Sequence, residues 1–325
     1  MINTETIYAG LKLRNPLIIG SSGLTKSAAA NKKLEDMGAS AIVLKSLFEE
    51  QIELQGDEML AGTDAPEAAD YIRNYVKANA LENYLNLISE TKALCSIPVI
   101  ASINCYKSSA WVEFAEKIAE VGADALELNI FYLCTDPKTP AADLYNLYIS
   151  ILDRVCRRIS IPVTVKIGKC FGNIPGLVDQ LKAHGAKGVV MFNRYYRPDI
   201  DIEKLQITSG DVFGNPSDLS DTLRWTAIIS GFVPGISIAS SNGVFSHEDV
   251  IKCLLAGASA VQLCSVVYKN GPEIIRTISN GLEEWIEAKK YRTIADFQGK
   301  LSFSNVSNPS MYERSQFMRY YSDRK

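Results

Sequence analysis

Short apolar stretches recur along the chain, and each is followed by a longer segment in which apolar residues have helical spacing. Eight stretches are apolar enough to form buried strands of a parallel sheet. Four begin with or follow proline (NPLIIG, IPVIASI, IPVTVKI and VPGISIA), and four follow a Gly-Ala pair (MGASAIVLK, VGADALELN, HGAKGVVMF and AGASAVQLC). The two kinds alternate strictly along the chain. We therefore predict eight strands that alternate with helices.

The helical spacing predicts helices over residues 27–37, 108–121 and 143–159. Eight strands alternating with helices favour a closed parallel sheet, the (β/α)8 or TIM barrel of the α/β class. An open doubly wound sheet is the alternative, and the lack of a G-x-G-x-x-G stretch counts against it. A chain of 325 residues can bury one barrel or two smaller domains, and we expect one domain over residues 1–325.

Several segments lie outside the repeating units. Residues 4–14 alternate around Ala9-Gly10, which predicts a short hairpin that plugs the floor of the barrel. Long connections follow strand two (residues 48–71) and strand six (residues 191–218), and a further long loop follows strand four. Connections that leave the carboxyl ends of strands should overhang the active face. The tail, residues 302–325, has weak periodicity and is either a docking arm or partly disordered.

Composition excludes several classes of function. The net charge is −3 and the isoelectric point is about 5.6, which argues against a nucleic-acid partner. No apolar run approaches the roughly 18 residues of a membrane span, so no membrane association is expected. The seven scattered cysteines, with no C-x-x-C pair, are typical of reduced thiols in a cytoplasmic protein. Two histidines make a histidine-based metal site improbable.

The last two predicted strands end in small polar residues, as a phosphate site requires. Asn242-Gly243 follows the seventh strand and Cys264-Ser265 follows the eighth. Turns of this kind let backbone N–H groups approach an anion, and a helix N-terminus adds a favourable dipole. The end of the last two strands is also where barrels most often bind phosphate.

Lysine and asparagine follow other strands at the same face. Lys45 and Lys166 each end an apolar strand, where a buried ammonium needs a bound anion, an electron-rich ring or a carboxylate partner. Asn104 and Asn129 also follow apolar strands, and their amides can pair with the edge of a heterocycle or serve as turn residues. Glu127 alternates with apolar residues and is a candidate partner for a lysine. Together these residues describe a pocket for a flat, polar cofactor that carries a phosphate.

At these residues the chain resembles the dihydroorotate dehydrogenase family, which are FMN enzymes on a (β/α)8 barrel. The resemblance covers about residues 2–303 and is strongest at NPLIIGSSG, AIVLKS, TVKI, KNGPEII and IADFQGKL. It implies that FMN is contacted by Ser22, Gly23, Lys45, Ser46, Asn104, Asn129 and Lys166, with its phosphate held by Asn242, Gly243, Cys264 and Ser265. Lys166 would lie near the isoalloxazine. We assign Lys45 and Asn193 to the substrate.

The chain departs from the family where the substrate binds. The Asn-Leu-Ser-Cys-Pro-Asn stretch after strand four reads Asn129-Ile-Phe-Tyr132-Leu-Cys134, so Tyr132 takes the position of the cysteine base. The Asn-x-Met-Gly-Leu-Pro-Asn stretch after strand two is replaced by GTDAPEAADYIRNY. FGNPSD replaces the glycine-rich turn after strand six. The flavin half of the pattern is kept and the orotate half is rewritten.

Tyrosine and cysteine differ in acid–base chemistry. The unperturbed pKa of tyrosine is about 10 against about 8.5 for cysteine, so tyrosine is better suited to donate a proton at neutral pH. Three options remain open: Tyr132 donates a proton, Cys134 acts as the base, or Tyr132 is a packing aromatic. With Lys166 near the flavin, the candidate catalytic residues are Tyr132, Cys134 and Lys166.

The resemblance implies an oxidoreductase that converts dihydroorotate to orotate in pyrimidine biosynthesis. The alternatives are a flavin-dependent reductase of another cyclic amide or enone, with Tyr132 as proton donor, and a non-catalytic flavin-binding protein. A tRNA dihydrouridine synthase would need a basic face that the charge does not supply. The expected partners are a small-molecule substrate and a soluble electron acceptor such as fumarate, or a partner subunit. A homodimer is also an option.

Overall fold

The computed structural model describes residues 2–61, 69–104 and 110–313. Eight parallel strands form a closed barrel, because each strand pairs with the next in the chain and the last pairs with the first. The barrel strands are β3 (Leu17–Ile19), β4 (Ala41–Val43), β6 (Val99–Asn104), β7 (Ala125–Asn129), β8 (Val163–Ile167), β9 (Gly188–Met191), β12 (Ser237–Ser241) and β13 (Ala260–Leu263). The predicted (β/α)8 barrel is confirmed.

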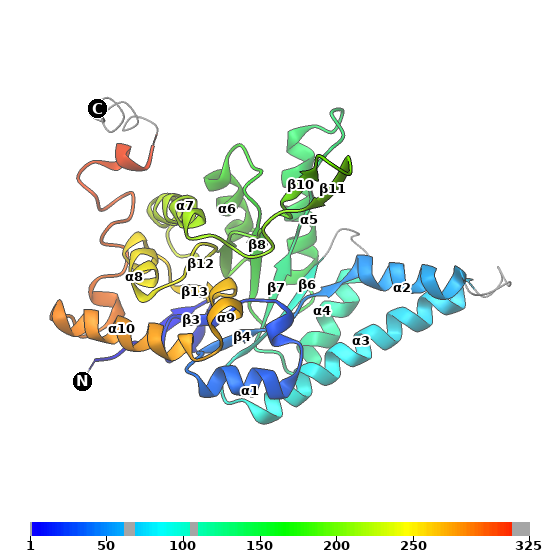
Figure 1. Cartoon of the computed structure of the whole chain (residues 1–325), viewed down its shortest axis with the longest axis horizontal. Coiled ribbons are helices and arrows are strands. Elements are labelled where there is room, and N and C mark those ends of the chain that lie inside the picture. Colours follow the sequence, from blue (N-terminus) through cyan, green and yellow to red (C-terminus); the bar gives the residue numbers. More distant parts are fainter. Residues whose placement is uncertain (1, 62–68, 105–109, 314–325) are drawn as a thin grey trace.

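Helices surround the barrel (Figure 1). They are α1 (Ala28–Asp36), α2 (Glu49–Ala61), α3 (Ala69–Leu94), α4 (Ala110–Glu120), α5 (Ala141–Cys156), α6 (Ile174–Ala183), α7 (Leu219–Phe232), α8 (His247–Ala256), α9 (Ser265–Asn270) and α10 (Ile274–Ala288). The helices predicted from spacing correspond to α1, α4 and α5. In the part of the chain that the structure describes, no helix has the length and apolarity to cross a membrane.

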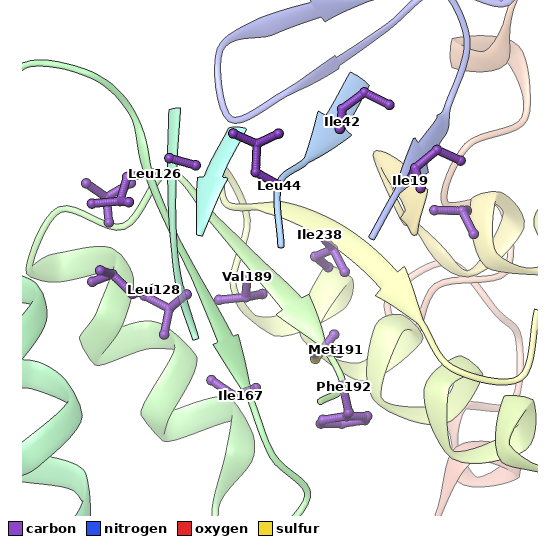
Figure 2. Close-up of a cluster of buried hydrophobic side chains, with 14 of the residues drawn as sticks. Ile19, Ile42, Leu44, Leu126, Leu128, Ile167, Val189, Met191, Phe192 and Ile238 are labelled. Atoms are coloured by element: carbon purple, nitrogen blue, oxygen red, sulfur yellow. The ribbon is translucent and has the colours of Figure 1, made fainter. Parts of the chain in front are cut away.

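Strand side chains alternate between two hydrophobic clusters. Leu17 and Ile19 of β3 belong to the layer between barrel and helices, whereas Ile18 between them belongs to the inner cluster. Figure 2 shows side chains of the outer layer, among them Ile42 and Ile238. This alternation is the period of two that a strand buried on both faces imposes.

The N-terminal hairpin consists of β1 (Thr6–Tyr8) and β2 (Leu11–Leu13), which pair antiparallel as predicted. Tyr8 is fully buried in the inner cluster, and several of the inward strand residues around it are alanines. Small inward side chains leave room in the narrow barrel for the tyrosine ring. The inner cluster contains Tyr8, Ala9, Leu13, Ile18, Ala41, Val43, Ile100, Ala125, Val190, Ala239 and Ala260. The hairpin therefore fills the amino-terminal end of the barrel.

The connection after the second barrel strand is mainly helical, so the prediction of a long loop is wrong there. The short strand β5 (Leu47–Phe48) leads directly into α2, which packs along α3. Figure 1 shows the two helices extending side by side from the barrel. Helix α2 was missed because it buries only Ile52 and Gly56 among its described side chains, which leaves a weak apolar period. The rest of the predicted loop, residues 62–68, lies outside the described residues.

The connection after β9 forms an antiparallel ribbon, β10 (Pro198–Asp201) and β11 (Gln206–Ser209), followed by the 3₁₀ turn η3 (Pro216–Asp218). The tail runs back over α7. The backbone N–H of Phe303 donates to the carbonyl of Ala227 at 3.0 Å, and the Phe303 ring lies 4.8 Å from that of Phe232. Residues 314–325 of the tail lie outside the described part.

Candidate active site

The barrel interior changes from apolar to polar toward the carboxyl ends of its strands. Asn104, Asn129 and Lys166 lie side by side in register on β6, β7 and β8. Since residues paired across parallel strands point to the same face, the three side chains share the inner face at one level. The sequence predicted this arrangement, because each of the three residues follows or ends an apolar strand.

A buried charge network lies just below this level. The ammonium Nζ of Lys166 donates to Oε1 of Gln262 at 3.2 Å, and Nε2 of Gln262 donates to Oε2 of Glu127 at 2.7 Å. The other carboxylate oxygen of Glu127 lies 3.7 Å from the ammonium. All three residues are buried. The sequence suggested the lysine partner of Glu127, but not the glutamine that bridges the pair.

A cavity of about 540 Å³ opens above Lys166 and holds five of the predicted residues: Lys166, Asn193, Asn242, Cys264 and Ser265. Its other walls include five aromatic and two arginine side chains. They are formed by Gly20, Ser21, Phe192, Arg194, Tyr195, Tyr196, Arg197, Ser209, Asp211, Val212, Phe213, Ser241, Gln262 and Tyr268. A cavity of this size with a few convergent polar groups fits a small molecule or cofactor. The expected overhang of the connection after β9 is confirmed, because Ser209 and Val212 line it.

The turn after β12 has the backbone that an anion site requires. Asn242 and Gly243 both have left-handed φ angles, +81° and +78°. A Cβ atom at Gly243 would lie 2.1 Å from the backbone nitrogen of Leu219, so no larger residue fits. The Asn242 amide donates to the carbonyl of Phe192 at 2.8 Å, which ties this turn to the end of β9. The backbone groups of the turn are thus held in place by their own neighbours.

Residues 211–215, here named the covering segment, close one side of the cavity. Arg194 donates from both terminal nitrogens to the carbonyls of Asp211 and Val212. Gly214 donates its N–H to Oγ of Ser265 at 2.8 Å, and Phe213 packs its ring 5.2 Å from Tyr268. The predicted phosphate residue Ser265 is therefore also an anchor of this segment.

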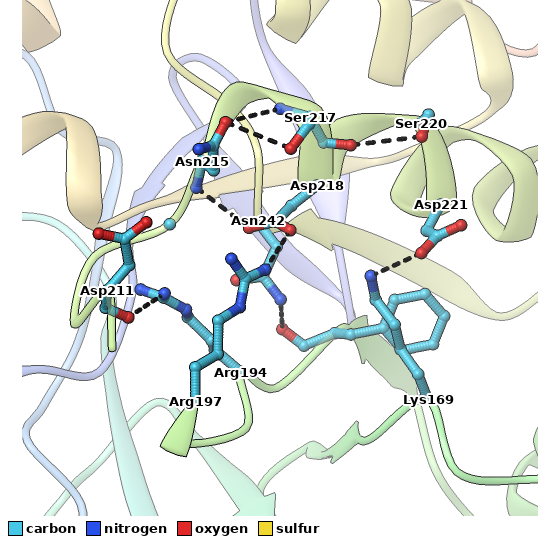
Figure 3. A network of polar contacts seen from close by, with 12 residues as sticks. Lys169, Arg194, Arg197, Asp211, Asn215, Ser217, Asp218, Ser220, Asp221 and Asn242 are labelled. Carbon is cyan, nitrogen blue, oxygen red and sulfur yellow. Dashed lines mark hydrogen bonds and ion pairs between the residues drawn. The ribbon is translucent and has the colours of Figure 1, made fainter. Parts of the chain in front are cut away.

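Figure 3 shows Arg194 and Arg197 beneath this region, close to Asn242. Arg197 forms a 2.5 Å ion pair with Asp218. Burial alone would raise the pKa of Asp218, but the N–H of Asn215 and the Arg197 guanidinium lower it, so the carboxylate stays ionised. Burial and the neighbouring charge of Arg197 lower the pKa of Arg194.

Two further predicted residues lie at the rim, on the first βα turn. The hydroxyl of Ser22 accepts from the N–H of Leu24, and a Cβ atom at Gly23 would lie 2.7 Å from the hydroxyl of Tyr268. Burial raises the pKa of the Cys264 thiol, while a hydrogen bond with Ser22 and the charge of Lys166 act in the opposite direction. Cys264 is therefore a neutral wall residue.

Lys45 and Ser46 line a neighbouring cavity of about 350 Å³, between β5 and the α2–α3 arm. Lys45 is exposed there, together with Lys26. The two cavities meet at serine hydroxyls: Ser46 Oγ lies 2.9 Å from Ser21 Oγ, and Ser21 lines the first cavity. Lys45 thus stands on the same face as Lys166 but in a separate hollow.

Tyr132 and Cys134 lie on the loop between β7 and α5, and neither lines the two cavities. Tyr132 is half-buried, and the thiol of Cys134 donates to the carbonyl of Asp136 at 3.6 Å. The start of this loop is held by Tyr148, whose hydroxyl donates to the carbonyl of Ile130 at 2.5 Å. Three other tyrosines do line the first cavity: Tyr195, Tyr196 and Tyr268.

Tyr195 was not predicted. Its hydroxyl donates to Sγ of Cys170 at 2.8 Å, and its ring lies 4.7 Å from Phe131. Burial and the contact with Cys170 raise the pKa of Tyr195, so the hydroxyl keeps its proton. A Cβ atom at Gly168 would lie 2.2 Å from that hydroxyl. The one usable sequence signal was Gly168, which directly follows β8, the strand that carries Lys166.

The chain forms a closed parallel barrel, and a cavity with a buried lysine and aromatic side chains lies at the carboxyl ends of its strands. Together with the left-handed turn at Asn242 and Gly243, here named the anion turn, these features define a cofactor-dependent barrel enzyme. Sequence comparison gives the family. The family model described as dihydroorotate dehydrogenase matches residues 3–286, and the chain belongs to this family. The family is flavin-dependent, and the chain is an oxidoreductase that acts on a CH–CH bond.

Individual relatives are distant but cover almost the whole chain. The catalytic subunit of dihydroorotate dehydrogenase B (NAD(+)) from Thermoplasma volcanium is 25% identical over 92% of this chain and 98% of its own length. The protein of the same name from Methanosarcina acetivorans is 28% identical over 89% and 93%. The chloroplastic dihydropyrimidine dehydrogenase (NADP(+)) of Arabidopsis thaliana is 22% identical over 89% of this chain and 75% of its own length.

Proposed function

We propose that the chain is an FMN-dependent oxidoreductase that oxidises dihydroorotate to orotate. The observation that carries this proposal is Lys166, an ammonium at the base of the larger cavity. It lies in register with two asparagines and opposite the anion turn at Asn242 and Gly243. A buried cation suits an electron-rich ring, and a turn of backbone donors suits its phosphate.

The residues of the cavity fit FMN. A Cβ atom at Gly20 would lie 3.2 Å from Oε1 of Gln262, so a glycine keeps that wall open for a flat ring. The buried Nε of Arg194 has no hydrogen-bond partner among the described residues, and it lies in the cavity wall with Ser265 and Asn242. Unpaired donors next to small-residue turns suit phosphate oxygens. When bound, FMN would accept the hydride of the substrate.

The remaining roles belong to the chain itself. Lys45 and Asn193 bind the anionic substrate, because an ammonium and an amide can pair with its carboxylate and ring edge. Tyr132 exchanges the proton, since it occupies the position of the family's cysteine base. A soluble acceptor or a partner subunit reoxidises the flavin. The two archaeal relatives described above are named as the catalytic subunit of dihydroorotate dehydrogenase B (NAD(+)), which supports a partner subunit.

Anaerobic mixing tests this proposal. The purified chain should carry FMN, identified by its absorbance and mass, and dihydroorotate should bleach the yellow colour with orotate as product. Bound FMN that no dihydropyrimidine bleaches would rule out the assigned substrate while leaving the cofactor in place. A chain that takes up no flavin after reconstitution would rule out both.

A second function, reduction of another cyclic amide or an enone, is favoured by Tyr132 in place of a cysteine. A phenol is a better proton donor than a base at neutral pH, which suits the reducing direction. Anaerobic mixing also distinguishes the dehydrogenase from the reductase. If chemically reduced enzyme is reoxidised rapidly by an enone or a pyrimidine but is not reduced by dihydroorotate, the chain works as a reductase. A flavin that responds to no donor or acceptor would indicate a binding protein.

A further inference from the structure

Glu127 lies beneath the larger cavity, deeper in the barrel than Lys166, which lines the cavity. Its side chain is 1% exposed, and it comes from β7, next to the strand that carries the lysine. Its Oε2 accepts from Gln262, but its Oε1 has no hydrogen-bond partner among the described residues. A buried carboxylate oxygen without a donor is costly unless a nearby charge compensates it.

The compensating charge is the ammonium of Lys166. It lies 3.7 Å from that oxygen, which is close enough for strong attraction in a buried site but beyond hydrogen-bond length. The hydroxyl of Tyr8 stays neutral, because burial and then the charge of Glu127 raise its pKa. A positive and a negative charge therefore lie close together beneath the cavity, and only the lysine lines it.

Gln262 fixes the direction of the lysine. Its amide oxygen accepts from the ammonium at 3.2 Å and its amide nitrogen donates to the carboxylate at 2.7 Å, so one side chain connects both charges. An ammonium has three donors, and Gln262 occupies one of them. Because Lys166 lines the cavity, its ammonium can also donate to a ligand there.

We infer that Glu127 is a positioning residue that holds Lys166 against the flavin and offsets its charge, which lowers the reduction potential of the flavin. This inference rests on the proposed function, in which the cavity binds FMN. A cation beside the isoalloxazine favours the reduced flavin, because reduction adds electron density to the ring. A carboxylate behind that cation weakens the effect without touching the flavin.

The test compares the midpoint potential of bound FMN, and its dissociation constant, in the parent protein and in Glu127→Gln, Lys166→Met and the double variant. In Glu127→Gln, reduced FMN should bind about tenfold more tightly relative to oxidised FMN. For a two-electron couple that ratio is a rise of about 30 mV. Lys166→Met should shift the potential in the opposite direction. In the Lys166→Met background, Glu127→Gln should have a much smaller effect, because Glu127 acts through the lysine.

The matched control is Glu113→Gln, which removes an exposed carboxylate of α4 that pairs with Lys117 at 3.0 Å. It should leave the potential unchanged. Gln262→Met removes the bridge without a change of formal charge, and should raise the potential by less than Glu127→Gln. If Glu127→Gln does not fold, the potential of Gln262→Met tests the inference instead.

The outcomes are distinct. An unchanged potential in holo Glu127→Gln and Gln262→Met would overturn the inference and leave the proposed function intact. The inference would also be overturned if Glu127→Gln shifted the potential by the same amount in the parent protein and in the Lys166→Met background. A parent protein that binds no flavin would overturn the proposed function and the inference together.

Discussion

The side-chain amide of Asn193 donates a 2.6 Å hydrogen bond to Oδ1 of Asn129, and so connects the ends of β9 and β7 across β8. Asn129 is only 7% exposed, so loss of the donor would leave a largely buried amide oxygen without its partner. We predict that Asn193→Ala raises the dissociation constant of FMN about tenfold, the equivalent of about 1.4 kcal/mol. Flavin fluorescence titration measures it.

Asn305→Ala is the control for this change. Asn305 donates from its amide to the carbonyl of Gly299 at 2.8 Å, in the C-terminal segment. It should lose a comparable hydrogen bond without an effect on flavin affinity. Equal affinity in the parent protein and in Asn193→Ala would show that the connection between the two asparagines does not shape the cofactor site.

The sequence predicted the barrel because its signals are local. Each strand is marked by its own apolar run and by the proline or Gly-Ala pair before it, and closure follows from eight such units. The hairpin was predictable for the same reason, through its alternation around Ala9-Gly10. The strand-end residues Asn104, Asn129 and Lys166 were found because parallel strands end at a common face.

What the sequence did not predict depends on contacts between distant segments. Gln262 meets Glu127 across 135 positions, and nothing in AVQL distinguishes an inward glutamine from a solvated one. Arg194 and Tyr195 lie in an irregular connection, where no period indicates direction. The separation of Lys45 from the larger cavity depends on helix α2, which has a weak apolar period.

Gly243 should not tolerate a side chain. Gly243→Ala combines a left-handed φ of +78° with a Cβ atom 2.1 Å from the backbone of Leu219. The backbone strain costs about 1–2 kcal/mol and the overlap about 1–3 kcal/mol more. We predict a fall of at least about 2 kcal/mol in the free energy of unfolding, measured with urea.

Gly122→Ala separates these two contributions. Gly122 also has a left-handed φ, +96°, but an added Cβ atom would meet nothing within 4 Å. This variant should lose only the strain of about 1–2 kcal/mol. If the two variants are equally stable, the turn after β12 can shift away from Leu219 and is not a rigid anion site.

Tyr132→Phe tests the proton-transfer role. Removal of a general acid or base lowers turnover about 10²–10⁴-fold, so the variant should lose at least about 10² in kcat with its flavin content unchanged. Cys134→Ala should stay within a few-fold of the parent protein, because its thiol donates to Asp136 on an exposed loop. A large loss in Cys134→Ala with full activity in Tyr132→Phe would move the role to the cysteine. A loss confined to Tyr195→Phe would move it to Tyr195, in the wall of the larger cavity.

Glu35 should make the free energy of unfolding depend on pH in the acid range. Its carboxylate accepts from Lys32 at 2.9 Å and from the N–H and hydroxyl of Ser96 at 2.9 and 2.6 Å. Burial alone would raise its pKa, but these bonds lower it from 4.5 to about 2. A lowered pKa in the folded state means that the stabilisation is complete above pH 4.5 and is lost as pH falls toward 2.

Glu35→Gln should therefore flatten the dependence of melting temperature on pH between about 5 and 2, while lowering the melting temperature at pH 7. Asp36→Asn is the control, because Asp36 also pairs with Lys32, at 3.0 Å, but is exposed. It should leave the pH dependence almost unchanged. A pH profile of Glu35→Gln parallel to that of the parent protein would assign the acid sensitivity to other carboxylates.

Lys45 was assigned by sequence to both cofactor and substrate, and the two cavities separate these roles. Lys45 lines the hollow beside the α2–α3 arm, whereas Lys166 lines the larger cavity with the anion turn. We therefore predict that Lys45→Ala raises KM about tenfold for a substrate that carries a carboxylate. The dissociation constant of FMN should change less than about twofold, because uniform substrate binding is lost without loss of the cofactor site.

Lys26→Ala is the matched control, since Lys26 is also an exposed lysine of the same hollow. Exposed charges at a distance from a ligand contribute little to its binding, so KM should change less than about threefold. Equal effects of the two variants would mean that the hollow attracts anions only through its summed charge. A large loss of FMN affinity in Lys45→Ala, with KM unchanged, would instead place Lys45 at the flavin and leave the substrate carboxylate to groups around Asn193.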